Sequence, residues 1–174
     1  MLNLTDLNLE VRLLMAEEIE SDCSREVNYV SNRLTEEGKK KFPELLIQAA
    51  NEHDSDWLAS ELNRLGLIKT HETRRTRGGT STVKVPITAA ETLAEGEFNL
   101  YFVRALCKYA IEKGNSEVEV YRAKQVSVPR SSSTQLLGSR LDPKQLLKHI
   151  ASEGLNAILP QGPNSGLSVR LVNS

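Results

Sequence analysis

The chain has 174 residues, which is enough to bury the apolar core of one domain without disulfides or a structural metal. Its 22 basic and 23 acidic side chains nearly cancel to a net charge of −1, which excludes a general attraction to nucleic acid or to an anionic membrane and leaves only local clusters. The apolar fraction of 39% is low for a globular protein, so we expect neighbouring subunits to complete the burial of its apolar surface.

The beginning of the sequence carries no signal for export. The first residues, MLNLTDLNLEVRLL, lack the basic segment of a signal peptide, and no apolar run approaches the roughly 18 residues of a membrane span. Cys23 and Cys107 lie far apart and in no metal-binding spacing, which is typical of a protein from a reducing compartment. We expect a soluble protein that is synthesised in the cytoplasm and has no membrane partner.

The N-terminal part of the chain has the apolar periodicity of a helix. Apolar residues from Leu4 to Leu34 recur mostly at steps of three or four, which predicts one long amphipathic helix. The apolar stripe thins between Cys23 and Glu26, where a bend or break is expected. About nine turns is long for a compact domain. Residues 1–34 are therefore predicted to be an assembly element that packs against a partner.

Two shorter helices are predicted next. Thr35 suits an N-cap, because two glutamates follow it in the first turn of the helix. Pro43 also suits a helix start. A third helix is expected from about Ser55, and Gly66 is placed to end it in the left-handed conformation.

The character of the sequence changes between Leu67 and Ile87. This stretch is rich in Thr and Val and has Gly78-Gly79 in its middle, which predicts two extended arms joined by a tight turn. Pro86 ends the second arm or confines it to a sheet edge.

A long helix is predicted behind this hairpin. The run from Thr88 to Glu91 reads as a capping box, and the helix extends to about Lys113, before Gly114. Its apolar face is expected to form the centre of the core, with Leu93, Phe98, Tyr101, Phe102, Ala105, Leu106 and Tyr109.

The last third of the chain predicts a small sheet and one more helix. Glu117–Val128 suggests a strand with a bulge or one buried on both faces, and residues 129–139 a Ser-rich loop. Asp142-Pro143 predicts the start of a helix that Gly154 ends. Two extended segments follow in the tail.

The fold class predicted from these elements is α+β. A helical N-terminal half, a β-hairpin and a central aromatic helix precede a small C-terminal sheet with one helix. The chain is expected to divide into the long helix of residues 1–34, a main α+β domain of residues 35–154, and an extended C-terminal tail of residues 155–174.

The residues with catalytic or metal-binding chemistry are dispersed. His53, His71 and His149 fall in three different predicted elements, and His53 is better explained as part of a helix N-terminus than as a metal ligand. Cys107 is expected in the core. The serines at 131–133 lack a nucleophile elbow. Three glutamates, Glu91, Glu95 and Glu97, are expected on a charged helix face. The sequence therefore predicts no enzyme activity and no metal or cofactor.

The hairpin carries the most distinctive local charge. Residues 69–84 contain five basic residues and one acidic residue, Glu72. The basic residues are Lys69, Arg74, Arg75, Arg77 and Lys84. We expect them to contact either an acidic protein surface or the phosphates of a nucleic acid.

Two short helices followed by a basic hairpin is also the chain order of a winged-helix DNA-binding protein. There the second helix would enter a groove and the hairpin would bind phosphate. That helix, however, exposes Asp56 and Glu61, which would repel phosphate. DNA binding is therefore kept as the alternative to protein contact.

Three further stretches resemble small structural proteins encoded among the head genes of tailed bacteriophages. They are TAAETLAEGEFNLYFVRALCKYAI, YRAKQVSVPRSSSTQLLGSRLDPKQLL and GPNSGLSVRL. The resemblance implies a virion structural protein, capsid-associated, decorating or part of the connector. Its implied partners are copies of itself and other virion proteins, the major capsid protein or the portal. A second contact surface is expected in the loop of residues 129–140, with Arg130, Ser131, Ser132 and Arg140.

Overall fold

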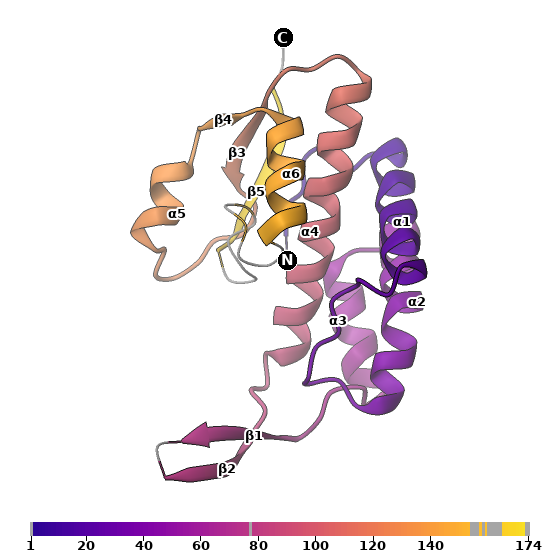
Figure 1. Cartoon of the computed structure of the whole chain (residues 1–174), viewed down its shortest axis with the longest axis vertical. Helices are drawn as coiled ribbons and strands as arrows, with labels where there is room; N and C mark the ends of the chain where they lie inside the picture. Colours follow the sequence, from indigo (N-terminus) through magenta and orange to yellow (C-terminus); the bar gives the residue numbers. More distant parts are fainter. Residues whose placement is uncertain (1, 77, 154–156, 158, 160–164, 173–174) are drawn as a thin grey trace.

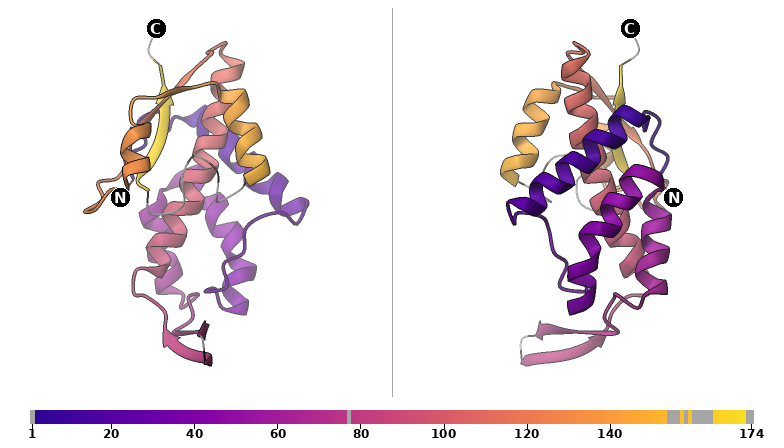
Figure 2. Two further views of the ribbon diagram at one scale, coloured as in Figure 1. Left: turned by 60° about the vertical axis from the view of Figure 1, so that its left-hand side comes forward. Right: turned by 90° about the vertical axis from the view of Figure 1, so that its right-hand side faces the viewer.

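The long helix α4 (Ala89–Glu112) runs through the middle of the molecule, and other elements pack around it (Figures 1 and 2). This computed structural model describes residues 2–76, 78–153, 157, 159 and 165–172. Within that part of the chain there are six helices and two antiparallel sheets, one of two strands and one of three. The α+β class expected from the sequence is confirmed.

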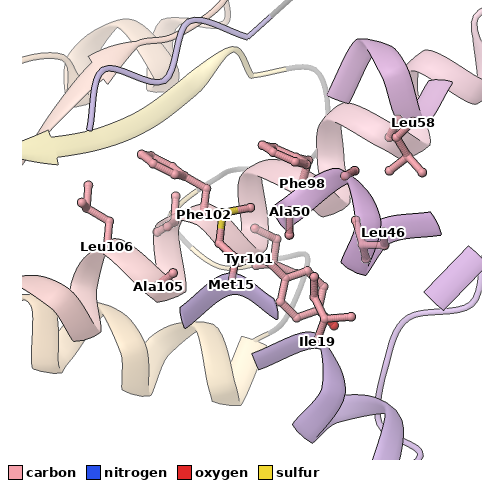
Figure 3. Packing of buried hydrophobic residues seen from close by; sticks show 14 of the residues in the cluster. Met15, Ile19, Leu46, Ala50, Leu58, Phe98, Tyr101, Phe102, Ala105 and Leu106 are labelled. Carbon is pink, nitrogen blue, oxygen red and sulfur yellow. The ribbon is translucent and has the colours of Figure 1, made fainter. Parts of the chain in front are cut away.

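The hydrophobic core lies around α4, whose side chains are buried on almost every side. Phe98, Tyr101 and Phe102 are fully buried, as expected, whereas Tyr109 is half-buried at the margin. Figure 3 shows apolar side chains of the first three helices gathered around these aromatic rings. They come from Met15 and Ile19, Leu46 and Ala50, and Leu58.

Helix α1 (Leu9–Ser24) is shorter than the sequence predicts. Asn8 caps its beginning, because its Oδ1 accepts a hydrogen bond of 3.0 Å from the Val11 amide. At its end, the Val27 amide donates to the Asp22 carbonyl and the Glu26 amide to the Cys23 carbonyl. This pair of bonds is a Schellman motif, and it places Glu26 in the left-handed region with φ of 56°.

The helix predicted over residues 4–34 is therefore wrong in length, although α1 ends within the stretch from Cys23 to Glu26 where a bend or break was expected. Val27, which was counted in the apolar stripe, is 63% exposed beyond the helix end. The buried stripe of α1 instead packs on α2 (Glu36–Glu52) and α4 of its own chain. The length of this helix consequently gives no reason to expect a partner.

The next two helices follow their local signals. The Thr35 hydroxyl accepts a 3.0 Å hydrogen bond from the Gly38 amide, so the predicted N-cap of α2 is confirmed, but Pro43 lies inside the helix rather than at its start. Helix α3 (Ser55–Arg64) begins after Asp54, whose carboxylate accepts from two amides. Gly66, with φ of 64°, ends it as predicted.

The predicted hairpin is confirmed. Strand β1 (His71–Thr76) pairs antiparallel with β2 (Gly79–Lys84), with His71 opposite Lys84 and Thr76 opposite Gly79. Figure 1 shows the hairpin beyond the lower end of the helices, away from the body of the protein.

The start of α4 differs from the sequence prediction. Thr88 has φ of −85° and ψ of 9°, and its side chain makes no capping hydrogen bond, so the capping box from Thr88 to Glu91 is wrong. The end agrees: the helix stops at Glu112, and Gly114 has φ of 79°.

The second sheet has the strand order β4-β3-β5, and both pairings are antiparallel. Strand β3 (Val118–Arg122) lies between β4 (Arg140–Leu141) and β5 (Leu167–Leu171). Residues 167–171 are extended as expected, but they form a strand whose first three residues are buried rather than a projecting tail. Asn99 of α4 donates a 2.7 Å hydrogen bond to the Leu167 carbonyl and so joins the helix to this strand.

The segment before α6 (Pro143–Glu153) is not the expected loop. Residues Ser131–Leu136 form a short helix, α5, in which Ser133 is buried. Helix α6 begins where Asp142-Pro143 predicts, and the Asp142 carboxylate accepts a 2.7 Å hydrogen bond from the Lys144 amide. Gly154 and the first predicted segment of the tail lie outside the described residues.

Candidate interaction surfaces

The hairpin β1–β2 is a two-stranded arm whose outer edges have no strand partner in the described part of the chain. Most of its side chains are exposed on both faces, and among those whose burial the structure describes only Glu72 and Val83 are half-buried. A free two-stranded ribbon is marginally stable in water, and its unpaired amides and carbonyls can accept a further strand.

The base of this arm is fixed to the body. The Arg33 guanidinium contacts the Glu72 carboxylate at 2.8 Å, and Leu34 forms a β-bridge with Ile68. The Lys69 ammonium donates a 2.8 Å hydrogen bond to the Asn32 carbonyl. The arm is therefore held in a defined direction at its base while its tip projects.

The five predicted basic residues have different surroundings. Arg74 contacts Glu72 at 2.7 Å, and hydrogen bonds from Arg33 and Arg74 lower the pKa of Glu72 to about 2. Lys69 is used at the base of the arm, and Arg77 lies outside the described residues. Arg75 and Lys84 are exposed, and no described residue pairs with either of them. The positive charge offered to a partner is thus smaller than the sequence indicates.

The second predicted surface is not continuous with the arm. Arg130, Ser131 and Ser132 are exposed at the beginning of α5, and Arg140 lies on the edge strand β4 with its guanidinium 3.4 Å from Glu117. Figure 1 shows α5 and β4 well separated from the hairpin. The basic residues of the hairpin and those of residues 129–140 therefore do not form one surface.

The first three helices and the hairpin have the chain order of a winged helix, and an isolated β-bridge joins Leu34 to Ile68. The packing differs, however, because α3 lies against α4 and α2 rather than against α1. The Arg64 guanidinium is paired with Glu61 at 2.5 Å, so α3 presents no unpaired base among the described residues.

A buried network of charges joins α1 to α4, and the sequence analysis missed it. Asp22 accepts hydrogen bonds from the Tyr101 hydroxyl at 3.1 Å and from the Arg104 guanidinium. Glu18, one turn earlier, pairs with Arg104 and with Lys108. Burial raises the pKa of Asp22, but the hydrogen bond and charge of Arg104 outweigh it, so the pKa lies below its usual value.

The signal for this network was present but ambiguous. Glu18 and Asp22 stand four residues apart, and so do Arg104 and Lys108, which is the spacing of facing helix surfaces. Alone, each pair looks like an ordinary solvated face. Only the packing of α1 on α4 turns the two pairs toward each other.

The three glutamates expected on one charged face of α4 have three different fates. Glu91 is exposed, whereas Glu95 is buried and paired with Lys124 at 2.5 Å. Glu97 is only 3% exposed, and no described residue donates a hydrogen bond to it. Burial raises the pKa of Glu97 to about 8. The expectation of a common charged face is therefore wrong.

A cleft of about 970 Å³ opens beside this network, between the end of α1, helix α4 and helix α6. A smaller cavity of about 250 Å³ lies toward the base of the hairpin. Tyr29 and Glu97 line both spaces.

Two of the residues considered for catalysis or metal binding have packing contacts. His53 stacks on Trp57 with ring centroids 4.2 Å apart, and Cys107 is fully buried, which raises its pKa to about 12. In the described part of the chain, no three His, Cys, Asp or Glu side chains are grouped to hold a metal ion. No helix in the same residues is both long and apolar enough to cross a bilayer.

Comparison with known proteins gives no assignment: the chain matches no family model, no curated protein and no solved structure.

Proposed function

We propose that this protein is a structural component of a tailed-phage particle and acts by protein–protein contact through the hairpin arm. The supporting observation is the arm itself: two paired strands that project from the body, with unpaired edges and exposed faces. The resemblance of three sequence stretches to head-associated phage proteins supports the same role.

The chemistry of the arm favours a protein partner over other ligands. The strands carry mainly Thr, Ser and a few bases, and their backbone edges offer rows of hydrogen-bond donors and acceptors. Such an edge binds an extended segment by strand addition, in which main-chain hydrogen bonds supply affinity. The charges of Arg75 and Lys84 would then give specificity for a partner with an acidic surface.

The direct test is mass spectrometry of purified virus particles from cells that carry the gene, with the copy number measured against a known capsid protein. A ring-like number of copies would indicate a connector, and hundreds would indicate a shell component. Absence of the protein from intact particles would refute the proposal.

The role of the arm is tested by the double variant Arg75→Glu/Lys84→Glu. The matched control is Lys144→Glu/Lys148→Glu, which makes the same charge change at exposed positions of α6. We expect the arm variant to fold normally but to lose incorporation into particles several-fold, while the control retains it. Equal incorporation of both variants would show that the charges of the arm are not needed for assembly into particles.

DNA binding is the second candidate, because α2 and α3 precede the basic hairpin in the chain order of a winged helix. Binding through the arm would depend on a few phosphate contacts, so affinity for duplex DNA should fall steeply between about 50 and 200 mM salt. If the wild-type protein binds in this way and Arg75→Ala flattens the salt dependence, DNA binding replaces the structural proposal.

A further inference from the structure

Glu97 differs from the other buried acids near α1 and α4. Glu18, Asp22 and Glu95 are each paired with at least one base. Glu97 is buried to the same degree, yet no described residue donates a hydrogen bond to its carboxyl. Burying a carboxyl without a partner is costly, and in folded proteins such groups are normally satisfied.

The neighbouring base cannot satisfy Glu97 without giving up its own partners. Arg104 is the base whose charge acts on Glu97, but its guanidinium already donates to Asp22 and pairs with Glu18. Asp22 acts on Glu97 in the opposite direction, as a like charge. Among the described residues, the Glu97 carboxyl is therefore left without a basic partner.

The described residues of the other walls add no unpaired base near Glu97. Helix α6 contributes Leu147, Ile150 and Ala151 to the large cleft. On the side of the small cavity, Arg33 is bound to Glu72. The larger cleft also contains Arg25, which is paired with Asp22, and Lys108, which is paired with Glu18.

The space around Glu97 is open to a ligand. Glu97 lines both the 970 Å³ cleft and the 250 Å³ cavity. The aromatic ring of Tyr29 lines the same two spaces and is partly exposed, and Val27 lies beside it on the larger cleft. A buried acid behind an apolar and aromatic rim suits a positively charged head on a hydrocarbon stem.

We propose that Glu97 anchors a binding site for an organic cation, a guanidinium or primary ammonium group on an aliphatic stem, which enters through the cleft beside Tyr29. The cation would donate hydrogen bonds to the unpartnered carboxylate, and its stem would contact the rim. A divalent metal is a poorer fit, because it requires several oxygen ligands and this site offers one uncommitted carboxyl.

The first experiment titrates the protein with n-butylguanidinium, whose charge does not change in the working pH range. The neutral isostere n-butylurea has the same stem and shape. We expect saturable binding of butylguanidinium, followed by chemical-shift changes at Tyr29 and the cleft residues, and at least about tenfold weaker binding of butylurea.

The variant Glu97→Gln tests the anchor. It keeps the size of the side chain and removes the charge, and it should fold because the wild-type carboxyl is mostly protonated at neutral pH. We expect at least about a tenfold loss of butylguanidinium affinity. The control Glu91→Gln, the same change on the exposed first turn of the same helix, should bind as the wild type does.

The pH dependence supplies a second readout. The cation binds the ionised carboxylate, so below pH 8 affinity should rise about tenfold for each pH unit and then level off. Binding at pH 7 should release close to one proton, which calorimetry measures by comparing buffers with different ionisation enthalpies.

Three results would overturn the proposal: no saturable binding of butylguanidinium, equal binding of butylurea, or equal binding by Glu97→Gln. The exposed arm residues Arg75 and Lys84 do not line this site, so its failure would leave the proposed assembly role untouched.

Discussion

Replacing Arg104 by Gln should destabilise the protein strongly, because Arg104 holds two buried carboxylates. Asp22 and Glu18 are each only 6% exposed, and both contact its guanidinium. Removing one partner of a buried ion pair typically costs about 3–5 kcal/mol. We expect about 3 kcal/mol, the lower end, because Lys108 still pairs with Glu18 and Arg25 with Asp22.

The matched control is Arg25→Gln, which removes the other base bound to Asp22. The Arg25 side chain is 60% exposed, so its loss should cost less than about 1 kcal/mol. Urea unfolding of both variants, followed by circular dichroism, measures the difference in the free energy of unfolding. If Arg104→Gln costs no more than Arg25→Gln, the network contributes little and the reasoning is refuted.

The cost of Arg104→Gln should also depend on pH. In the wild type the pKa of Asp22 is lowered, so its contribution to stability is present above the pKa of the unfolded chain and is lost as pH falls through the folded value. Without Arg104, burial raises that pKa, and the variant regains stability on acidification. The cost should therefore be larger at pH 7 than at pH 4.5, and an equal cost at both would contradict this.

Three further predictions concern single positions. Glu26→Gly should stabilise the protein by about 0.5–1 kcal/mol, because Glu26 has a positive φ that glycine adopts without strain; lower stability in urea unfolding would contradict the Schellman geometry. Gly38→Ala should destabilise it by about 1–3 kcal/mol, because the new Cβ would lie 2.5 Å from the Leu67 carbonyl oxygen; a rise in Tm would show that this contact relaxes. The wild type should lose stability, of order 4 kcal/mol, as pH rises from about 5 to 8, because the folded state holds the Glu97 proton more tightly than the unfolded chain does. Glu97→Gln should not show this loss, and parallel pH profiles of the two proteins would refute the prediction.

The sequence predicted those elements whose signals are local. Thr35 caps its helix through its own side chain, and Gly66 and Gly114 end theirs with a positive φ that glycine favours. The hairpin was predicted for the same reason, since the glycines between two Thr-rich arms specify a tight turn.

Two of the failed predictions concern places where the local sequence signal is weak. The chain does not return to a helix after the break expected near Cys23, because Glu26 ends α1 in the left-handed position, where a glycine would have given a clearer signal. Ser131–Leu136 was expected to be a loop because Ser-rich sequence favours turns, and its helix is short.

Composition and local motifs by themselves determined the class of the fold, the hairpin and most helix boundaries, because these depend on neighbours within a few residues. Only the tertiary structure decided which charges are buried. Helix α4 is covered by α1, α2, α3, α6 and β5, so Glu97 on a seemingly polar face became an enclosed acid. Gly38 shows the same division: helix propensity favours alanine there, but the packed carbonyl of Leu67 leaves no room for its Cβ.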